Sequence, residues 1–263
     1  MSDWIVAIIL GIIEGVTEFL PVSSTGHLLL TQGWLPRQSD LFNVVIQSGA
    51  VLAVLLVFTN RVKELFQKWR QPETRDYLLK LFVAFFITAV GGLLLKKGGF
   101  KLPEEAGPVA WATLIGGILI LIIEAAIRQR KPSNEITWII VIAVGLGQLV
   151  AAVFPGASRS GTTILFALML GLNRPLATEF SFLLGIPTLL SAGALQSFSA
   201  LQHPSSEPTR WDMILVGTIA AAITAFVVVK WLLRFVQTHT FVAFGWYRIV
   251  LGAAILLFVA SSK

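Results

Sequence analysis

Two stretches of the sequence decide the fold: Glu14-Gly-Val-Thr-Glu-Phe-Leu-Pro-Val-Ser-Ser-Thr-Gly-His27 and Pro155-Gly-Ala-Ser-Arg-Ser-Gly-Thr-Thr163. Each places charged and hydroxyl side chains inside a run that is otherwise apolar enough for a membrane interior. An ionisable group at the depth of the bilayer core costs at least ~2.5 kcal/mol on insertion scales, so such groups usually line a polar cavity. The two stretches therefore predict both breaks in membrane helices and a functional site.

The composition is that of an integral membrane protein. Of the 263 residues, 56% are hydrophobic and 13% are charged, and the mean hydropathy is +0.81, which is too apolar for a soluble domain. No basic segment precedes the first apolar run, so we expect no cleaved secretory signal. The chain has no cysteine, which excludes disulfide and thiolate chemistry. We interpret the net charge of +6 as a topology signal rather than as evidence for a nucleic-acid partner.

Six further apolar runs are close to the ~20 residues that a helix needs to cross a bilayer. They lie at about 41–60, 77–95, 108–127, 176–199, 211–233 and 244–261. The two interrupted runs, 3–32 and 137–173, contain Pro, Gly and hydroxyl residues, and such backbone is tolerated at membrane depth only where protein or water satisfies it. We therefore expect two re-entrant helical hairpins and about ten helices in all. An ordinary kinked span at each break is the alternative.

The order of one hairpin and three spans occurs twice, at about 3–130 and 137–261. The breaks also share a Pro-x-x-Ser core, from Pro21 to Ser24 and from Pro155 to Ser158. Because three spans is an odd number, the second half must be inverted relative to the first, which brings two broken helices together near the midplane. The predicted fold is an all-α polytopic membrane protein, a single domain over 1–263 built from two inverted repeats.

Lys and Arg in the connecting loops predict the orientation, because they are enriched on the cytoplasmic side. One side holds thirteen: Arg61, Lys63, Lys68, Arg70, Arg75, Lys80, Arg128, Arg130, Lys131, Arg174, Lys230, Arg234 and Arg248. The other side holds six: Arg37, Lys96, Lys97, Lys101, Arg210 and Lys263. We expect the first side to be cytoplasmic, so that both termini and the mouth of the first hairpin face outward.

Glu14 and Glu18 are four residues apart, so on a helix their carboxylates share one face. They can converge on a divalent cation or share a proton, and a metal, an Arg or protonation would relieve their repulsion. The alternative is a pair at the membrane interface or bonded to neighbouring helices. Gly11 and Gly15 beside them indicate close helix packing.

Hydroxyl groups and an imidazole follow within nine residues of Glu18, namely Ser23, Ser24, Thr25 and His27. They form a plausible set of nucleophile and acid/base, because histidine changes protonation near neutral pH. The alternative is that these Ser and Thr side chains only bond backbone carbonyls, as they more often do in membrane helices. The other histidines, His203 and His239, lie in predicted loops.

The stretch from Pro155 to Thr163 has the features of an anion cradle. Its glycines let backbone N–H groups approach a ligand, and a helix that begins just after it carries partial positive charge at its N-terminus. Arg159 can bind phosphate oxygens as a bidentate fork. The flanking hydroxyls are those of Ser158, Ser160 and Thr163. The alternative is that Arg159 pairs with Glu14, Glu18 or Glu179, and we expect Glu179 to support the second hairpin or to lie near Arg174.

These motifs resemble a known family. Glu14-x-x-x-Glu18 with Phe-Leu-Pro-Val-Ser-Ser-Thr-Gly-His27, and Pro155-Gly-x-Ser-Arg-Ser-x-x-Thr163, are similar to the two signature regions of the bacterial undecaprenyl-diphosphate phosphatases of the bacitracin-resistance type. The resemblance spans the chain. It implies a hydrolase of the bacterial inner (plasma) membrane that converts undecaprenyl diphosphate to the monophosphate carrier lipid for peptidoglycan synthesis, and thereby confers bacitracin resistance. It also implies dependence on divalent cations and a site that opens to the outer, periplasmic side.

The motifs and the resemblance together suggest a mechanism. Glu14 and Glu18 hold Mg²⁺ or Ca²⁺ against the diphosphate, Ser24 or a water is the nucleophile, and His27 is general acid or base. The phosphate-binding residues are Ser23, Thr25, Ser158, Arg159, Ser160 and Thr163. The rival is a transporter or flippase for an anionic prenyl-phosphate lipid, because inverted repeats with broken helices are also a transporter architecture. The sequence leaves the oligomeric state open, a homodimer included.

Overall fold

The computed structural model describes residues 2–100, 105–202 and 209–261, and within these ranges it contains eleven helices and no strand. Lys101, His203 and Lys263, which we expect in loops or at the terminus, lie outside the described residues. Most of the described chain is helical, as an apolar chain requires when water is absent and each backbone N–H must find a partner within its own segment.

Among the described residues, six helices are long and apolar enough to cross a membrane. They are α3 (Asp40–Val57), α5 (Pro72–Lys97), α6 (Ala106–Ile127), α9 (Arg174–Gln202), α10 (Trp211–Phe235) and α11 (Val242–Ser261). Each corresponds to one of the apolar runs, which confirms the predicted set of spans. The main difference is that α5 begins five residues earlier than expected, because Pro72 occupies its first turn, where the fixed φ of proline suits a helix start.

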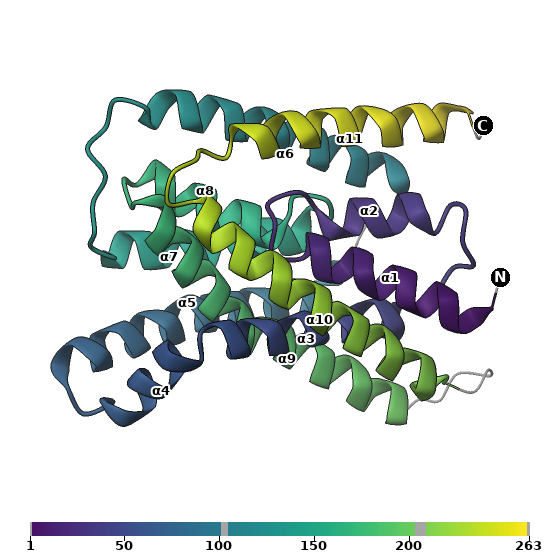
Figure 1. The fold of residues 1–263 in the computed structure, drawn as a ribbon, viewed down its shortest axis with the longest axis horizontal. Coiled ribbons are helices and arrows are strands. Elements are labelled where there is room, and N and C mark those ends of the chain that lie inside the picture. Colours follow the sequence, from purple (N-terminus) through teal and green to yellow (C-terminus); the bar gives the residue numbers. More distant parts are fainter. Residues whose placement is uncertain (1, 101–104, 203–208, 262–263) are drawn as a thin grey trace.

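The two interrupted runs form two helical hairpins, as predicted. The first consists of α1 (Asp3–Thr17) and α2 (Ser24–Thr31), and the second of α7 (Trp138–Val153) and α8 (Arg159–Met169). The longer arms, α1 and α7, have 15 and 16 residues, about 22–24 Å at helical rise, which is less than the ~30 Å hydrocarbon core. The first hairpin lies at the end of the molecule that holds both termini, and the second lies at the opposite end (Figure 1).

One helix of the described chain, α4 (Thr59–Gln67), does not correspond to any helix expected from the sequence. The apolar run at 41–60 divides at Phe58, which lies between α3 and α4 with φ −95° and ψ 20°. Polar and charged residues dominate α4, and Leu65 is its buried side chain. This amphipathic helix therefore follows a span and lies at the end away from the termini (Figure 1).

The helices pack in pairs that join the two halves of the chain. The first arm of each hairpin packs against the second span of the other half, α1 along α10 and α7 along α5. The first spans, α3 and α9, also pack together, as do the third spans, α6 and α11, which run side by side in Figure 1. Reciprocal packing of this kind is expected of inverted repeats, and the inversion itself stays a prediction.

The glycines of α1 allow this helix to approach α10 closely. A Cβ atom at Gly11 would lie 2.3 Å from the carbonyl oxygen of Gly217, and one at Gly15 would lie 2.3 Å from that of Ala221. A side chain at either position would push the backbones apart. The interpretation of Gly11 and Gly15 as packing residues is therefore confirmed, and this contact places the Glu14 and Glu18 face of α1 toward the interior.

Candidate active site

Both hairpin turns have the same local structure. Ser23 and Ser158, which cap α2 and α8, are the non-glycine residues with positive φ in the described chain, at 74° and 69°. Each hydroxyl accepts a hydrogen bond of 3.2 Å from the N–H three residues on, that of Gly26 or Gly161. This conformation costs roughly 1–3 kcal/mol at a non-glycine residue and is concentrated at functional sites. The turns are therefore strained in the same way.

The capping geometry corrects the pairing of the two turns. The shared Pro-x-x-Ser core matches Ser24 with Ser158, whereas the structure matches Ser23 with Ser158. The reason is that the second turn has one residue more between its proline and the cap. Ser24 and Arg159 then become equivalent, since each is the first residue of its helix.

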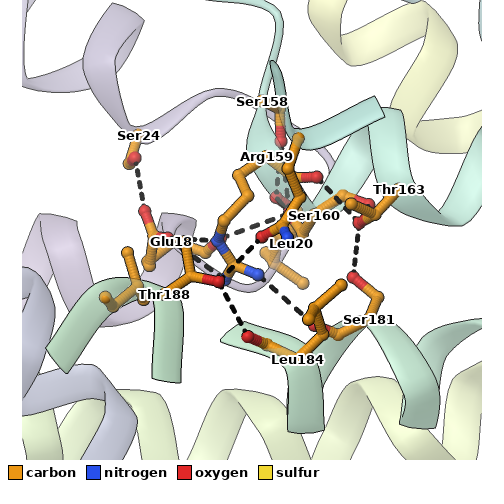
Figure 2. A network of polar contacts seen from close by, with 12 residues as sticks. Glu18, Leu20, Ser24, Ser158, Arg159, Ser160, Thr163, Ser181, Leu184 and Thr188 are labelled. Atoms are coloured by element: carbon orange, nitrogen blue, oxygen red, sulfur yellow. Dashed lines mark hydrogen bonds and ion pairs between the residues drawn. The ribbon is translucent and has the colours of Figure 1, made fainter. Parts of the chain in front are cut away.

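Ser24 and Arg159 meet at one carboxylate. The Ser24 hydroxyl donates to Oε2 of Glu18 at 2.9 Å, while Nε and Nη2 of Arg159 both donate to Oε1 at 3.3 Å (Figure 2). Both charged side chains are nearly buried, with 6% of Glu18 and 11% of Arg159 exposed. Of the carboxylates considered as partners of Arg159, the structure selects Glu18. Equivalent positions of the two hairpins thus converge on the same group.

Glu14 lies one helical turn before Glu18 and is fully buried. Neither of its carboxylate oxygens has a hydrogen-bond partner among the described residues. An unpaired carboxylate is expensive in a protein interior unless a cation or a proton compensates it. Glu14 therefore requires compensation by a cation or by a proton, which it could share with the neighbouring Glu18.

The hydroxyls of the second hairpin tie it to the first. Ser160 donates to the carbonyl oxygens of Leu20 at 3.0 Å and Glu18 at 3.2 Å, and Ser158 lies 3.5 Å from the oxygen of Leu20 (Figure 2). Thr163 lies one turn further along α8, where its hydroxyl donates to the carbonyl of Arg159 at 2.8 Å and contacts the Ser181 hydroxyl at 2.6 Å. These residues support the turn and Arg159.

His27 lies one turn into α2 and is partnered by a residue that the motifs do not indicate. Its Nδ1 is 2.7 Å from the carbonyl oxygen of Ser23, and its Nε2 is 2.7 Å from the hydroxyl of Tyr247 on α11. A carbonyl only accepts, so Nδ1 carries a proton; Nε2 accepts from the Tyr247 hydroxyl when the ring is neutral and donates to it when the ring is protonated. The two rings also stack, with centroids 5.6 Å apart. Thr25 is exposed and forms no hydrogen bond with Glu18 in the described chain.

Two residues to which the sequence analysis assigns no role shape the environment of Arg159. The Phe19 ring lies 5.4 Å from the guanidinium carbon, and a Cβ atom at Gly185 of α9 would lie 2.6 Å from Nη1. Nη1 also donates to the carbonyl oxygen of Ser181 at 3.4 Å. In the sequence, the one feature that could indicate Gly185 is its spacing, four residues after Ser181, which puts both residues on the same face of their helix.

Glu179 and Arg174 do not pair with each other, and Arg248 lies elsewhere than expected. Glu179 pairs with Arg61 of α4 at 3.1 Å, and Arg174 pairs with Glu124 of α6 instead. The placement of Arg248 in a cytoplasmic loop is wrong, because it lies within α11 and is fully buried. The remaining excess of Lys and Arg still favours the same orientation.

Six spans around two hairpins that meet at a buried ion pair define a polytopic membrane protein with a polar interior site. Residues 7–254 match the family described as "Bacitracin resistance protein BacA". A protein named "Undecaprenyl-diphosphatase" from Rhizobium etli is 49% identical over 255 residues, which cover 97% of this chain and 96% of that protein. One of the same name from Xanthomonas oryzae pv. oryzae is 48% identical over 263 residues, or 100% and 99% of the two chains. The chain belongs to the BacA family.

Proposed function

We propose that the protein hydrolyses undecaprenyl diphosphate to undecaprenyl phosphate and inorganic phosphate, which returns the carrier lipid to peptidoglycan synthesis. The name of relatives that match over nearly the whole chain supports this activity, and the family description fits bacitracin resistance. The structural observation that carries it is the meeting of Ser24 and Arg159 at Glu18, beside the unpartnered carboxylate of Glu14. A hydroxyl, a carboxylate and a guanidinium are the groups that phosphoryl transfer needs in one place.

The terminal phosphate is proposed to bind at the start of α8. Arg159 would exchange the carboxylate of Glu18 for phosphate oxygens, to which a guanidinium donates in a bidentate fork. The free N–H groups in the first turns of α2 and α8 add donors and partial positive charge. Phe19 and Gly185 restrict the guanidinium, so positioning of the phosphate would follow from positioning of Arg159.

Glu14 and Glu18 fit a divalent cation, Mg²⁺ or Ca²⁺. No group of three or more potential ligands among His, Asp and Glu occurs in the part of the chain that the structure describes. Mg²⁺ is often held by one or two carboxylates together with phosphate oxygens and water, which is the donor set available here. The orphaned oxygens of Glu14 are the observation that supports this assignment. When bound, the cation would neutralise charge on the diphosphate.

Glu18 is proposed to activate the nucleophile. Its Oε2 accepts the hydrogen bond of Ser24 at 2.9 Å, so it can take the proton as the serine oxygen forms a bond to the terminal phosphorus. The bond to the bridging oxygen breaks and undecaprenyl phosphate leaves; water then hydrolyses the phosphoserine and releases inorganic phosphate. Direct attack by a water bonded to Glu18 is the other route. His27 is proposed as general acid or base; as the acid it would be in its doubly protonated form and would give the Nε2 proton, beside Tyr247, to the leaving oxygen.

The test is phosphate release from a long-chain prenyl diphosphate by purified protein in detergent, with and without EDTA. We expect release that requires a divalent cation and that is lost in Glu18→Ala and Arg159→Ala. Glu179→Gln is the matched control, because Glu179 pairs with Arg61 outside the site. A trapped phosphoserine would support the covalent route, and an active Ser24→Ala variant would exclude it. A folded wild-type protein that releases no phosphate would contradict the proposal and favour a lipid transporter.

The protein is also proposed to lie in the plasma (inner) membrane with the first hairpin and both termini on the outer side. The excess of Lys and Arg near the opposite end supports this orientation. Because the chain contains no cysteine, single cysteines can be introduced at Trp34 and Lys68 and labelled with a membrane-impermeant maleimide in intact cells. Labelling of position 34 without position 68 is expected, and the reverse would overturn the orientation.

A further inference from the structure

Arg248 on α11 is the largest fully buried side chain in the described protein. Each of its five guanidinium N–H donors has a backbone carbonyl acceptor. Nε donates to Thr113 at 3.1 Å, Nη1 to Pro21 at 3.3 Å and Ala157 at 2.9 Å, and Nη2 to Ala112 at 3.2 Å and Gly156 at 2.9 Å. One side chain on the last helix thus contacts three separate segments of the chain.

Those segments include both hairpin turns. Pro21 precedes the strained cap Ser23 by two residues, and Ala157 directly precedes the strained cap Ser158. The first residue after each cap, Ser24 or Arg159, bonds to Glu18. The guanidinium of Arg248 therefore joins the two turns through the residues that precede each serine cap.

The backbone of α6 leaves space for this side chain. A Cβ atom at Gly116 would lie 2.1 Å from Nη2 of Arg248, and one at Gly117 would lie 2.9 Å from its Cβ. The second turn also presses on α6, since a Cβ atom at Gly156, where φ is +97°, would lie 2.4 Å from the carbonyl oxygen of Val109. Glycines thus permit α6, α11 and the turn to meet around the guanidinium.

Stability alone does not account for a cation at this depth. Within the described part of the chain no carboxylate forms an ion pair with Arg248. Removing a charge from water is expensive, and well-packed apolar residues often serve a buried position equally well or better. What an apolar residue does not provide is a rigid planar fork that fixes three backbones at once.

We propose that Arg248 is a positioning residue that fixes the separation and orientation of the two hairpin turns, so that Ser24 and Arg159 converge on Glu18. This inference rests on the proposed function for its catalytic consequence. Lysine at position 248 would keep the charge but offers three donors at a single nitrogen, which cannot reach acceptors on both turns and on α6 together.

The experiment compares Arg248→Lys with Arg248→Met and with a control, Arg174→Lys, in which a cation paired with Glu124 away from the site is changed in the same way. We expect Arg248→Lys to lower kcat about 100-fold, the loss associated with ~1 Å misplacement of reacting groups, with little change in KM. We expect the kcat of Arg248→Met to fall at least as far. The control, Arg174→Lys, is expected to keep the wild-type kcat. A Lys variant with wild-type kcat, or one that restores the activity lost in the Met variant, would show that only the charge matters and would overturn the proposal.

Hydrogen–deuterium exchange by mass spectrometry supplies a readout that does not depend on activity. Faster exchange is expected in peptides covering 18–26 and 154–162 in Arg248→Lys, and not in Arg174→Lys. Unchanged exchange in both turns would overturn the proposal. If the wild-type protein releases no phosphate, the proposed function fails while exchange still decides the role of Arg248.

A second variant covers the case in which Arg248→Lys does not fold. Gly116→Ala leaves Arg248 in the sequence but adds a methyl group that would lie 2.1 Å from Nη2 of Arg248. The guanidinium must therefore move. The same acceleration of exchange in both turns and the same loss of kcat are expected. Wild-type kcat together with wild-type exchange in this variant would contradict the positioning role.

Discussion

The two hairpins share a scaffold but carry opposite chemistry. Each turn has a serine cap at positive φ followed three residues later by glycine. The first hairpin contributes the acids and Ser24, and the second contributes Arg159. Neither half contains both the proposed nucleophile, Ser24, and the proposed phosphate-binding cation, Arg159. The comparison teaches that the same turn serves two purposes, and that the site exists only where the halves meet.

The first arms of the hairpins show the same contrast between function and structure. In α1 the buried polar residues are Thr17, which donates to the carbonyl of Ile13 at 2.7 Å, and Glu14, whose oxygens have no hydrogen-bond partner among the described residues. In α7 the buried polar residue is Gln148, whose amide donates to Thr88 at 2.8 Å and accepts from Thr188 at 3.1 Å. A satisfied neutral amide stabilises the packing of α7, whereas an unsatisfied carboxylate is retained at an energetic cost.

The largest expected effect comes from changing the cation of the second hairpin. Arg159→Lys keeps the charge but loses the fork that contacts Glu18, so we expect kcat for phosphate release to fall about 10²–10³-fold, as on removal of a main electrostatic contact. Arg61→Lys is the control, because Arg61 pairs with Glu179 in a similar way outside the site. Equal losses in both variants would mean that Arg159 has no special role.

A second comparison removes the buried charge from α1 and introduces one into α7, by the variants Glu14→Gln and Gln148→Glu. We expect Glu14→Gln to lower kcat about 100-fold and to abolish the response to added Mg²⁺, without loss of thermal stability, because an unpaired charge disappears. Gln148→Glu should instead lower the melting temperature by roughly 6–12 °C, since it introduces an uncompensated charge worth about 3 kcal/mol or more. A phosphatase assay and thermal unfolding in detergent measure both. A lower melting temperature in Glu14→Gln would instead show that Glu14 stabilises the packing of α1.

A smaller effect is expected from Gly185→Ala. Its methyl group would lie 2.6 Å from Nη1 of Arg159, so the guanidinium must shift away from its place beside Glu18. We expect about a tenfold loss of kcat. Gly92→Ala is the control, because a Cβ atom there meets nothing within 4 Å. Activity equal to the wild type in the Gly185 variant would show that the reaction tolerates displacement of the Arg159 guanidinium.

The smallest effect is predicted for Tyr247→Phe, which removes the hydroxyl bonded to His27 but keeps the stacked ring. The loss of one hydrogen bond corresponds to about 1 kcal/mol, or roughly a fivefold fall in kcat, with a changed pH profile because the proton affinity of Nε2 changes. A profile and rate identical to those of the wild type would separate Tyr247 from the reaction.

The spans and breaks could be predicted because they depend on local properties. Length and hydropathy identify helices that cross a bilayer, and Pro, Gly and hydroxyl residues identify where a helix stops. Convergence of Arg159 on an acid was also anticipated, as one of the alternatives for a charge at depth. The choice of Glu18 over Glu14 depends on how two helices are rotated, which periodicity leaves open.

The residues that could not be predicted depend on distant parts of the chain. Arg248 follows a Trp-Tyr pair near the start of an apolar run, which is typical of an interfacial residue. Its burial requires space at Gly116 on another helix and acceptors on both turns. The offset between Ser24 and Ser158 was missed for a related reason, since proline marks each turn but the cap is set by the following Ser-x-x-Gly.

The position of Arg248 in the last helix has a consequence for biosynthesis. The first hairpin is made early, yet one of the donors that hold its turn belongs to a residue synthesised after some 220 more have been added. The carboxylates and the strained serine must therefore remain incompletely braced during most of translation. The proposed role of Arg248 implies that the site matures only once α11 has packed, and that a chain truncated before α11 would lack the side chain that joins its two turns.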